Sequence, residues 1–99
     1  MRIIYEDLRK LREDVTRLVN EDKVEIWWWH IKPIHGIIRR HEIISTLLYG
    51  APLRSDKEIE GRYVIWSRFT EDGRLLRVVF QVKKVNGTRV VVVTAFEEE

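Results

Sequence analysis

The basic side chains of the C-terminal third are the first residues whose type and spacing suggest chemistry. Residues 61–96 contain seven lysines and arginines but only two acids, Glu71 and Asp72, and both acids fall in an expected turn. Arginine suits phosphate because its planar fork donates two parallel hydrogen bonds to phosphate oxygens. Solvated arginines on an exposed sheet are the alternative, although such surfaces usually mix both signs of charge. We therefore expect a polyanion or an acidic partner here, contacted by Arg68, Arg74, Arg77 and Lys83, with Arg77 ranked first.

His35 is the side chain best suited to move a proton, because imidazole changes its charge near neutral pH. Beside an arginine that stabilises charge, such a histidine could serve as acid or base in reactions at phosphate. The alternative is that His35 only caps or packs at the entry of a helix. Arg39 and Arg40 lie at that entry, where a helix prefers negative charge, so either they are solvated or they have a binding role.

Other kinds of chemistry find little support in the sequence. His30, His35 and His41 show no familiar metal-ligand spacing, and the chain has no cysteine to assist them. There is also no glycine-rich phosphate loop, nucleophile elbow or pair of catalytic carboxylates. We therefore expect neither a metal nor a cofactor.

Length and composition predict one globular domain spanning residues 1–99. The chain is 44% hydrophobic and 34% charged, with a net charge of only +2. It has no apolar run of about 18 residues, and residues 1–7 lack a secretory pattern, so we expect a cytoplasmic protein without a membrane span. Many charges, 23 isoleucines and valines, and very few Asn, Gln, Met and Cys residues are typical of proteins from thermophiles.

Hydrophobic periodicity predicts two helices and a strand in the first half. Apolar residues at steps of three and four indicate a helix over residues 5–20, and a similar stripe indicates another from Arg40 to Tyr49, which Gly50 would end. Between them, residues 24–31 have the aromatic and β-branched composition of a strand, on which Trp27 and Trp29 would share a face. Residues 24–52 thus form a strand and a helical entry, and residues 53–60 are a loop or a short edge strand.

Three further strands are predicted over residues 62–69, 74–85 and 88–96, joined by hairpins at Asp72-Gly73 and Asn86-Gly87. The expected fold is α+β, with N-terminal helices packed on one face of an antiparallel, basic meander formed by residues 61–96. On the middle strand, alternation separates a core face (Leu76, Val78, Phe80, Val82) from a half-polar face (Arg77, Val79, Gln81, Lys83). Val64 and Trp66 are expected to join the core. The last strand is apolar on both sides, which suits a central or covered position.

Two segments together resemble a known family. One runs from His35-Gly36-Ile37 through Glu42-Ile43-Ile44 to Gly50. The other begins at Gly61-Arg62, continues through Asp72-Gly73-Arg74 and closes with Val93-Thr94-Ala95. In this order, over roughly residues 26–96, the motifs resemble the BrnT toxins and their uncharacterised relatives.

The resemblance implies a RelE-like fold and a metal-independent ribonuclease toxin of a type II toxin–antitoxin pair. Such enzymes bind RNA on a basic sheet and cleave it through attack by the ribose 2′-OH, and their protein partner is an antitoxin. His35 would then be the acid or base, Arg68 and Arg77 would hold the scissile phosphate, and the flanking RNA would meet Arg74, Lys83, Arg39 and Arg40. The acidic residues 97–99 depart from the family and would repel phosphate.

A second hypothesis is a non-catalytic module of the same fold that binds RNA or protein. Leu8, Leu11, Val15 and Leu18 form an apolar seam on the first predicted helix, and this seam could join two copies in a homodimer. The alternative is that the seam packs on the domain's own sheet.

Overall fold

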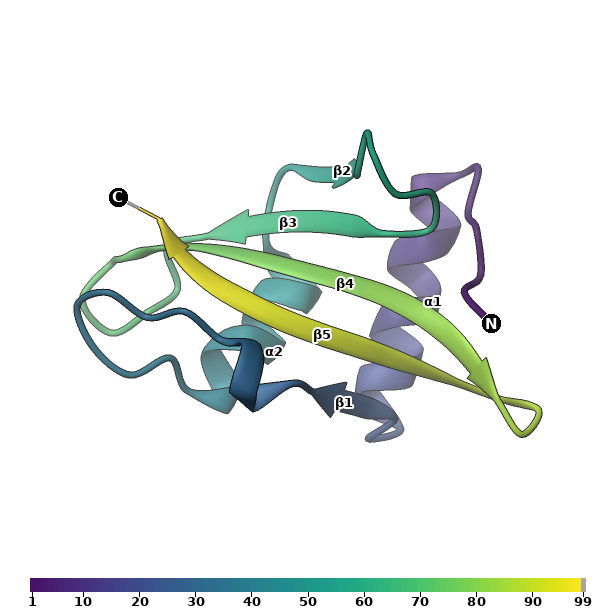
Figure 1. Ribbon diagram of the computed structural model, residues 1–99, viewed down its shortest axis with the longest axis horizontal. Helices are drawn as coiled ribbons and strands as arrows, with labels where there is room; N and C mark the ends of the chain where they lie inside the picture. Colours follow the sequence, from purple (N-terminus) through teal and green to yellow (C-terminus); the bar gives the residue numbers. More distant parts are fainter. Residues whose placement is uncertain (99) are drawn as a thin grey trace.

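The computed structural model describes residues 1–98 and places two helices behind one face of a five-stranded sheet (Figure 1). The α+β class is therefore confirmed. The elements in chain order are α1 (Leu8–Asn20), β1 (Val24–Ile26), the short 3-10 helix η1 (Trp28–His30), α2 (Arg40–Tyr49), β2 (Leu53–Ser55), β3 (Tyr63–Ser67), β4 (Leu75–Val85) and β5 (Thr88–Glu98). Within residues 1–98, no helix is both long enough and apolar enough to cross a membrane.

Both helices begin where a carboxylate accepts a backbone N–H. At α1 the Asp7 side chain accepts from Arg9 N at 2.9 Å, so the helix starts at Leu8 rather than at the predicted residue 5. At α2 the wholly buried Glu42 accepts from Arg39 N at 2.8 Å and also from Glu71 N at 3.2 Å. Glu42 therefore fixes the start of α2 against the turn between β3 and β4.

The sheet has the strand order β1-β5-β4-β3-β2, and β2, β3, β4 and β5 pair in an antiparallel manner as predicted. Asn86 (φ 51°) and Gly87 (φ 78°) supply the two left-handed residues of the β4–β5 turn. The prediction of an entirely antiparallel sheet is wrong, because β1 pairs with β5 in parallel, with Val24 opposite Val91. β5 is thus an inner strand, which explains why it is apolar on both sides.

The predicted strand over residues 24–31 is also wrong beyond Ile26. After Trp27 donates its N–H to Val93 O at 2.9 Å, the chain leaves the sheet in the single turn of η1 and returns at Lys32, which bridges to Phe96. Inside the turn, the His30 N–H donates to Trp27 O at 2.9 Å. Strand-like composition did not reveal this interruption, because aromatic and β-branched residues favour strands in general and do not mark where pairing with β5 stops.

The side chains of β3 face opposite to the prediction. Tyr63, Ile65 and Ser67 are buried toward the helices, whereas Val64 and Trp66 lie on the other face. The strand is apolar at successive positions, so alternation could not choose a face. Tertiary contacts choose it: Thr46 Oγ1 of α2 lies 2.6 Å from Ser67 Oγ, and the Tyr63 hydroxyl accepts from Tyr5 N at 2.7 Å.

The core lies between the helices and the sheet. The predicted core face of β4 (Leu76, Val78, Phe80, Val82) is buried to 3% exposure or less. Leu11, Val15 and Leu18 of α1 are buried in the same cluster. The apolar seam of α1 therefore packs on the domain's own sheet, and it is not an exposed surface for a homodimer.

Candidate nucleic-acid interface

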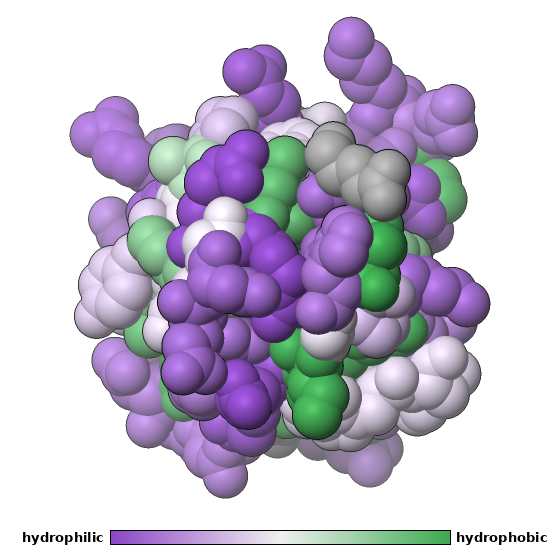
Figure 2. Space-filling model, turned by 90° about the vertical axis from the view of Figure 1, so that its left-hand side faces the viewer, coloured by the Kyte–Doolittle hydropathy of each residue, from purple (hydrophilic) through white to green (hydrophobic). Residues whose placement is uncertain are grey.

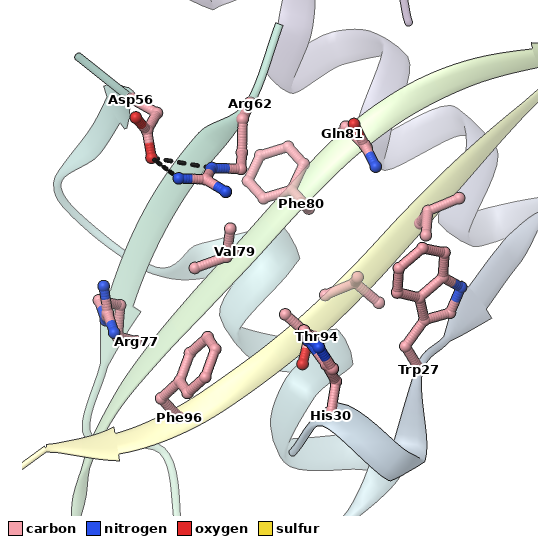
Figure 3. Close-up of a pocket in the computed structure, with 12 residues that line it drawn as sticks. Trp27, His30, Asp56, Arg62, Arg77, Val79, Phe80, Gln81, Thr94 and Phe96 are labelled. Atoms are coloured by element: carbon pink, nitrogen blue, oxygen red, sulfur yellow. Dashed lines mark hydrogen bonds and ion pairs between the residues drawn. The ribbon is translucent and has the colours of Figure 1, made fainter. Parts of the chain in front are cut away.

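The helices leave one face of the sheet without cover, and side chains from all five strands meet on it. Register places Arg54 of β2 beside Val64, Val64 beside Val79, Val79 beside Thr94, and Glu25 of β1 beside Val92. We call the hollow across this face the sheet trough (Figure 3). The residues that line it and are used below are Trp27, His30, Asp56, Arg62, Arg77, Val79, Gln81, Val92, Thr94 and Phe96.

Two cation–aromatic pairs lie toward opposite ends of this face. Lys83 Nζ lies 5.5 Å from the centroid of the Trp27 ring, and the guanidinium carbon of Arg77 lies 4.8 Å from that of Phe96. Arg77 and Lys83 are six residues apart on β4, which corresponds to about 20 Å at roughly 3.3 Å per residue. The face therefore combines an aromatic ring with a cation at two separated points, although Arg77 is also paired with Glu98, whose Oε1 lies 2.8 Å from Arg77 Nε.

The turn of η1 organises the tryptophans at one end of the trough. It lifts residues 28–30 out of the sheet, so that Trp29 stacks on Trp27 with ring centroids 5.4 Å apart and planes 22° from parallel. Trp27 and Trp29 do lie together as expected, but a helical turn rather than strand alternation brings them together. Trp29 is 71% exposed.

The hollow of the trough has a volume of about 330 Å³. Figure 3 shows the Asp56–Arg62 ion pair on one side of it and Trp27 with His30 on the other. Asp56 Oδ2 lies 2.8 Å from an Arg62 guanidinium nitrogen. Hydrogen bonds from Glu58 N, from Arg62 and from Ile59 N lower the pKa of Asp56, so this pair stays ionised at neutral pH.

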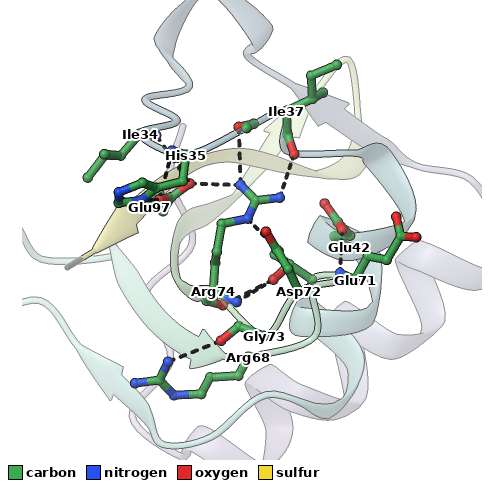
Figure 4. A network of polar contacts seen from close by, with 12 residues as sticks. Ile34, His35, Ile37, Glu42, Arg68, Glu71, Asp72, Gly73, Arg74 and Glu97 are labelled. Carbon is green, nitrogen blue, oxygen red and sulfur yellow. Dashed lines mark hydrogen bonds and ion pairs between the residues drawn. The ribbon is translucent and has the colours of Figure 1, made fainter.

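His35 belongs to a separate polar network at the end of the sheet (Figure 4). Its Nδ1 lies 2.6 Å from Glu97 Oε2, and its backbone N–H donates to the same carboxylate at 3.0 Å. The His35 side chain is 63% exposed while that of Glu97 is 1% exposed. The network thus holds one ring nitrogen on a buried carboxylate and leaves the other edge of the imidazole toward solvent.

Arg74, which directly precedes β4, is the third member of this network. Its Nη1 lies 2.7 Å from Glu97 Oε1, its Nε lies 2.7 Å from Asp72, and it donates to the carbonyl oxygens of Gly36 and Ile37 at 3.1 and 2.9 Å. Only 12% of the side chain is exposed. Arg74 therefore fastens the loop that carries His35, and its donors face protein acceptors.

The electrostatics of Glu97 follow from these contacts. Burial by itself would raise the pKa of this carboxyl, but the ion pair with Arg74 and the hydrogen bonds from His35 and Ile34 lower it to about 2. The hydrogen bonds that Arg74 makes to Asp72 and Glu97 raise the pKa of its guanidinium above the ordinary value. Both groups are fully charged at neutral pH.

The structure distributes the predicted site residues over several places. Arg68 donates to Gly73 O at 3.1 Å, Arg39 pairs with Glu71 at 3.2 Å, and Arg40 pairs with Asp22 at 3.1 Å. Arg77 and Lys83 lie on the uncovered face, whereas Glu97 and its partner His35 are reached from the helix-covered side of β5. Within residues 1–98, no hydrogen bond or ion pair joins His35, Arg68 and Arg77 to one another.

Four residues of these sites were given no site role from the sequence. Glu97 was assigned to an acidic tail, but β5 continues to Glu98, and Glu97 takes the next inward position after Val91, Val93 and Ala95. Glu98 lies 2.8 Å from Arg77 Nε. Phe96 and Gln81 occupy outward positions on β5 and β4. Extending the two-residue alternation beyond residue 96 would have placed Glu97 on the inward face of β5, but not its contacts with Arg74 and His35. Glu99 lies outside the described residues.

The end of the molecule that carries the His35 loop mixes hydrophilic and hydrophobic side chains (Figure 2). Ile34 and Ile37 of that loop are 50% and 71% exposed, and Phe69 of the neighbouring turn is 46% exposed. Among residues 1–98, no group of three or more His, Asp or Glu side chains is arranged so that it could bind a metal ion.

Comparison with protein families, with characterised proteins and with solved structures finds no match to this chain.

Proposed function

We propose that the uncovered sheet face binds single-stranded RNA. The observation that carries this proposal is the placement of two cation–aromatic pairs, Lys83 with Trp27 and Arg77 with Phe96, on one open face. In single-stranded RNA, bases stack on aromatic rings while cations contact the backbone phosphates. The proposal includes a cytoplasmic setting, where such RNA is abundant.

The spacing of the pairs favours an extended strand over a single nucleotide. About 20 Å of β4 separates Arg77 from Lys83, so one ligand reaches both only if it spans several nucleotides. Duplex nucleic acid is a poorer fit, because its bases are stacked on each other and do not present their faces to side chains. We expect the protein to prefer unpaired RNA.

The test is fluorescence anisotropy with a labelled single-stranded RNA and with the matching duplex, at several salt concentrations. Wild-type protein should bind the single strand more tightly, with affinity falling as salt rises. Lys83→Ala should weaken binding and reduce the salt slope by about 0.7, the value for one phosphate contact on a single strand.

Lys10→Ala is the matched control, because Lys10 is exposed on α1, on the opposite side of the molecule. It should leave both affinity and salt slope unchanged. Equal weakening by Lys83→Ala and Lys10→Ala would mean that the attraction is only a net-charge effect and would contradict the proposal.

A second candidate is the metal-independent ribonuclease toxin with a RelE-like fold that the BrnT resemblance implies. The His35–Glu97 contact favours it, because a carboxylate that orients an imidazole is the usual support for a general base. His35 would take the proton of a ribose 2′-OH, whose oxygen attacks phosphorus. The bond from phosphorus to the 5′ oxygen breaks, leaving a cyclic phosphate, and an acid protonates the departing oxygen.

In this candidate Arg74 positions the His35 loop, and Arg68 keeps the expected contact with the scissile phosphate. Arg77 lies on the uncovered face away from His35, so its expected role changes to holding flanking RNA, and the exposed Arg39 takes its place at the phosphate. The exposed Ile34 and Ile37 would then lie beneath an antitoxin. Incubating the protein with total RNA and excess EDTA tests the activity. Cleavage that is lost in His35→Ala but kept in His41→Ala, a change of another exposed histidine, would support it. Intact RNA at high excess of folded protein would count against it.

A further inference from the structure

We infer that the middle of the sheet trough is a binding site for one neutral nucleobase, whose hydrogen-bonding edge is contacted by Gln81 and Thr94. This inference rests on the proposed RNA binding and adds to it the part of the ligand that enters the hollow. The shape, the charge and the unmade hydrogen bonds of the trough all support this site.

The shape of the trough comes from short side chains in the middle and long ones around them. Val79 and Val92 are the short outward residues of β4 and β5 and form the floor. Trp27, Arg62 and Phe96 form the rim (Figure 3). The volume of about 330 Å³ is open on the side away from the sheet. A flat apolar floor fits the face of a planar ring.

The charges on the rim favour a neutral group over a phosphate. Arg62 is already paired with Asp56, and the Asp56 carboxylate itself lines the hollow and would repel an anion. Arg77 is paired with Glu98 at 2.8 Å. Within the described part of the chain, Lys83 makes no ion pair, so the phosphate of a bound nucleotide belongs beside Lys83 and the base belongs in the hollow.

The Thr94 and Gln81 side chains, which lie in the hollow, both have unmade hydrogen bonds. Thr94 Oγ1 is withdrawn from solvent without a hydrogen-bond partner. Among residues 1–98 the Gln81 carboxamide, which offers both a donor and an acceptor, makes no hydrogen bond either. In the β4–β5 register Gln81 lies directly opposite Val92, so Thr94 is the diagonal neighbour of Gln81. Diagonal positions on neighbouring strands are about 7–8 Å apart.

That separation suits a ring placed between the two side chains. The edge of a base carries adjacent donors and acceptors, which a carboxamide can match in pairs. Satisfying a buried hydroxyl that lacks a partner also removes a cost from the free protein. For the base to reach Thr94 Oγ1, a side chain that lines the hollow must move, and His30 is an exposed lining residue that can do so.

The experiment titrates the full chain with adenosine, guanosine, cytidine and uridine, without phosphate, and follows backbone and side-chain amide shifts by NMR. At least one nucleoside should shift the Gln81 side-chain amide and the Thr94 backbone amide. Gln81→Leu and Thr94→Val, which keep most of the side-chain volume, should each weaken its binding by about tenfold or more. Thr94→Ser keeps the hydroxyl and should bind like wild type.

RNA binding by the wild-type protein is measured in parallel, so that the two proposals fail separately. RNA binding with no nucleoside shifts in the trough overturns the base site and leaves the RNA proposal standing. Equal nucleoside affinity for wild type, Gln81→Leu and Thr94→Val also overturns it. Absence of RNA binding contradicts the proposed function itself. An unchanged amide spectrum outside the trough confirms that each variant is folded.

Discussion

Arg74 and Glu97 form an ion pair in which Nη1 lies 2.7 Å from Oε1, with only 12% and 1% of the two side chains exposed. The pair connects the start of β4 to the end of β5, and through Glu97 it reaches the backbone and ring of His35. Two residues that the sequence places in a basic strand and an acidic tail thus hold the loop that carries the candidate base.

Stability should depend on the charge of Glu97. The pKa of Glu97 is about 2 in the folded protein and 4.5 ordinarily. The stabilisation that the ionised Glu97 gives to the folded state is therefore fully present above about pH 4.5 and is lost as the pH falls toward 2. Glu97→Gln should therefore lower the denaturant midpoint at pH 7. The difference from wild type should shrink as the pH falls from 4.5 toward 2. A difference that stays constant over this range would contradict the assignment.

Gly50→Ala should destabilise the protein severely. A Cβ at Gly50 would lie 2.6 Å from the carbonyl oxygens of both Thr46 and Trp66, so the backbones of α2 and β3 would have to separate. Gly73→Ala is the control: φ is 73°, and nothing lies within 4 Å of an added Cβ, so only backbone strain of about 1 kcal/mol is expected. Similar denaturation midpoints for the two variants would show that there is room for a methyl group between Gly50 and the carbonyl oxygens of Thr46 and Trp66.

Leu11→Ala should cost about 2–5 kcal/mol of unfolding free energy, because it leaves a cavity in the core. Leu8→Ala, at a half-buried position of the same helix, should cost less. Both losses should be independent of protein concentration, since the seam of α1 packs on its own sheet. A loss that varies with concentration would instead indicate that α1 joins two copies.

The composition predicts a thermostable protein. We expect a thermal unfolding midpoint above the range of about 45–65 °C in which mesophilic domains cluster. Calorimetry at neutral pH measures this directly. A midpoint near 50 °C, well inside that mesophilic range, would refute the thermophilic interpretation.

Local patterns in the sequence were sufficient for several elements. The apolar stripe that ends before Gly50 predicted α2, and Asn86-Gly87 predicted the β4–β5 hairpin. Both predictions were possible because the interactions that form these features lie within a few residues of one another. The two faces of β4 were also correct, since Arg77, Gln81 and Lys83 recur on one face and the other face is apolar from Leu76 to Val82. On this basis Arg77 and Lys83 could be placed on an exposed surface.

Features that depend on distant partners were decided only by tertiary structure. The direction of β1 is set by pairing with β5, at the other end of the chain, and the faces of β3 are set by contacts with Tyr5 and Thr46. The partnership of His35 with Glu97 has the same origin. Hydrophobic alternation records which residues are buried, but it carries no information on which remote strand or carboxylate buries them. The sequence by itself therefore determined an α+β domain with a basic hairpin, and the packing of the chain decided which basic residues face solvent and which hold the fold together.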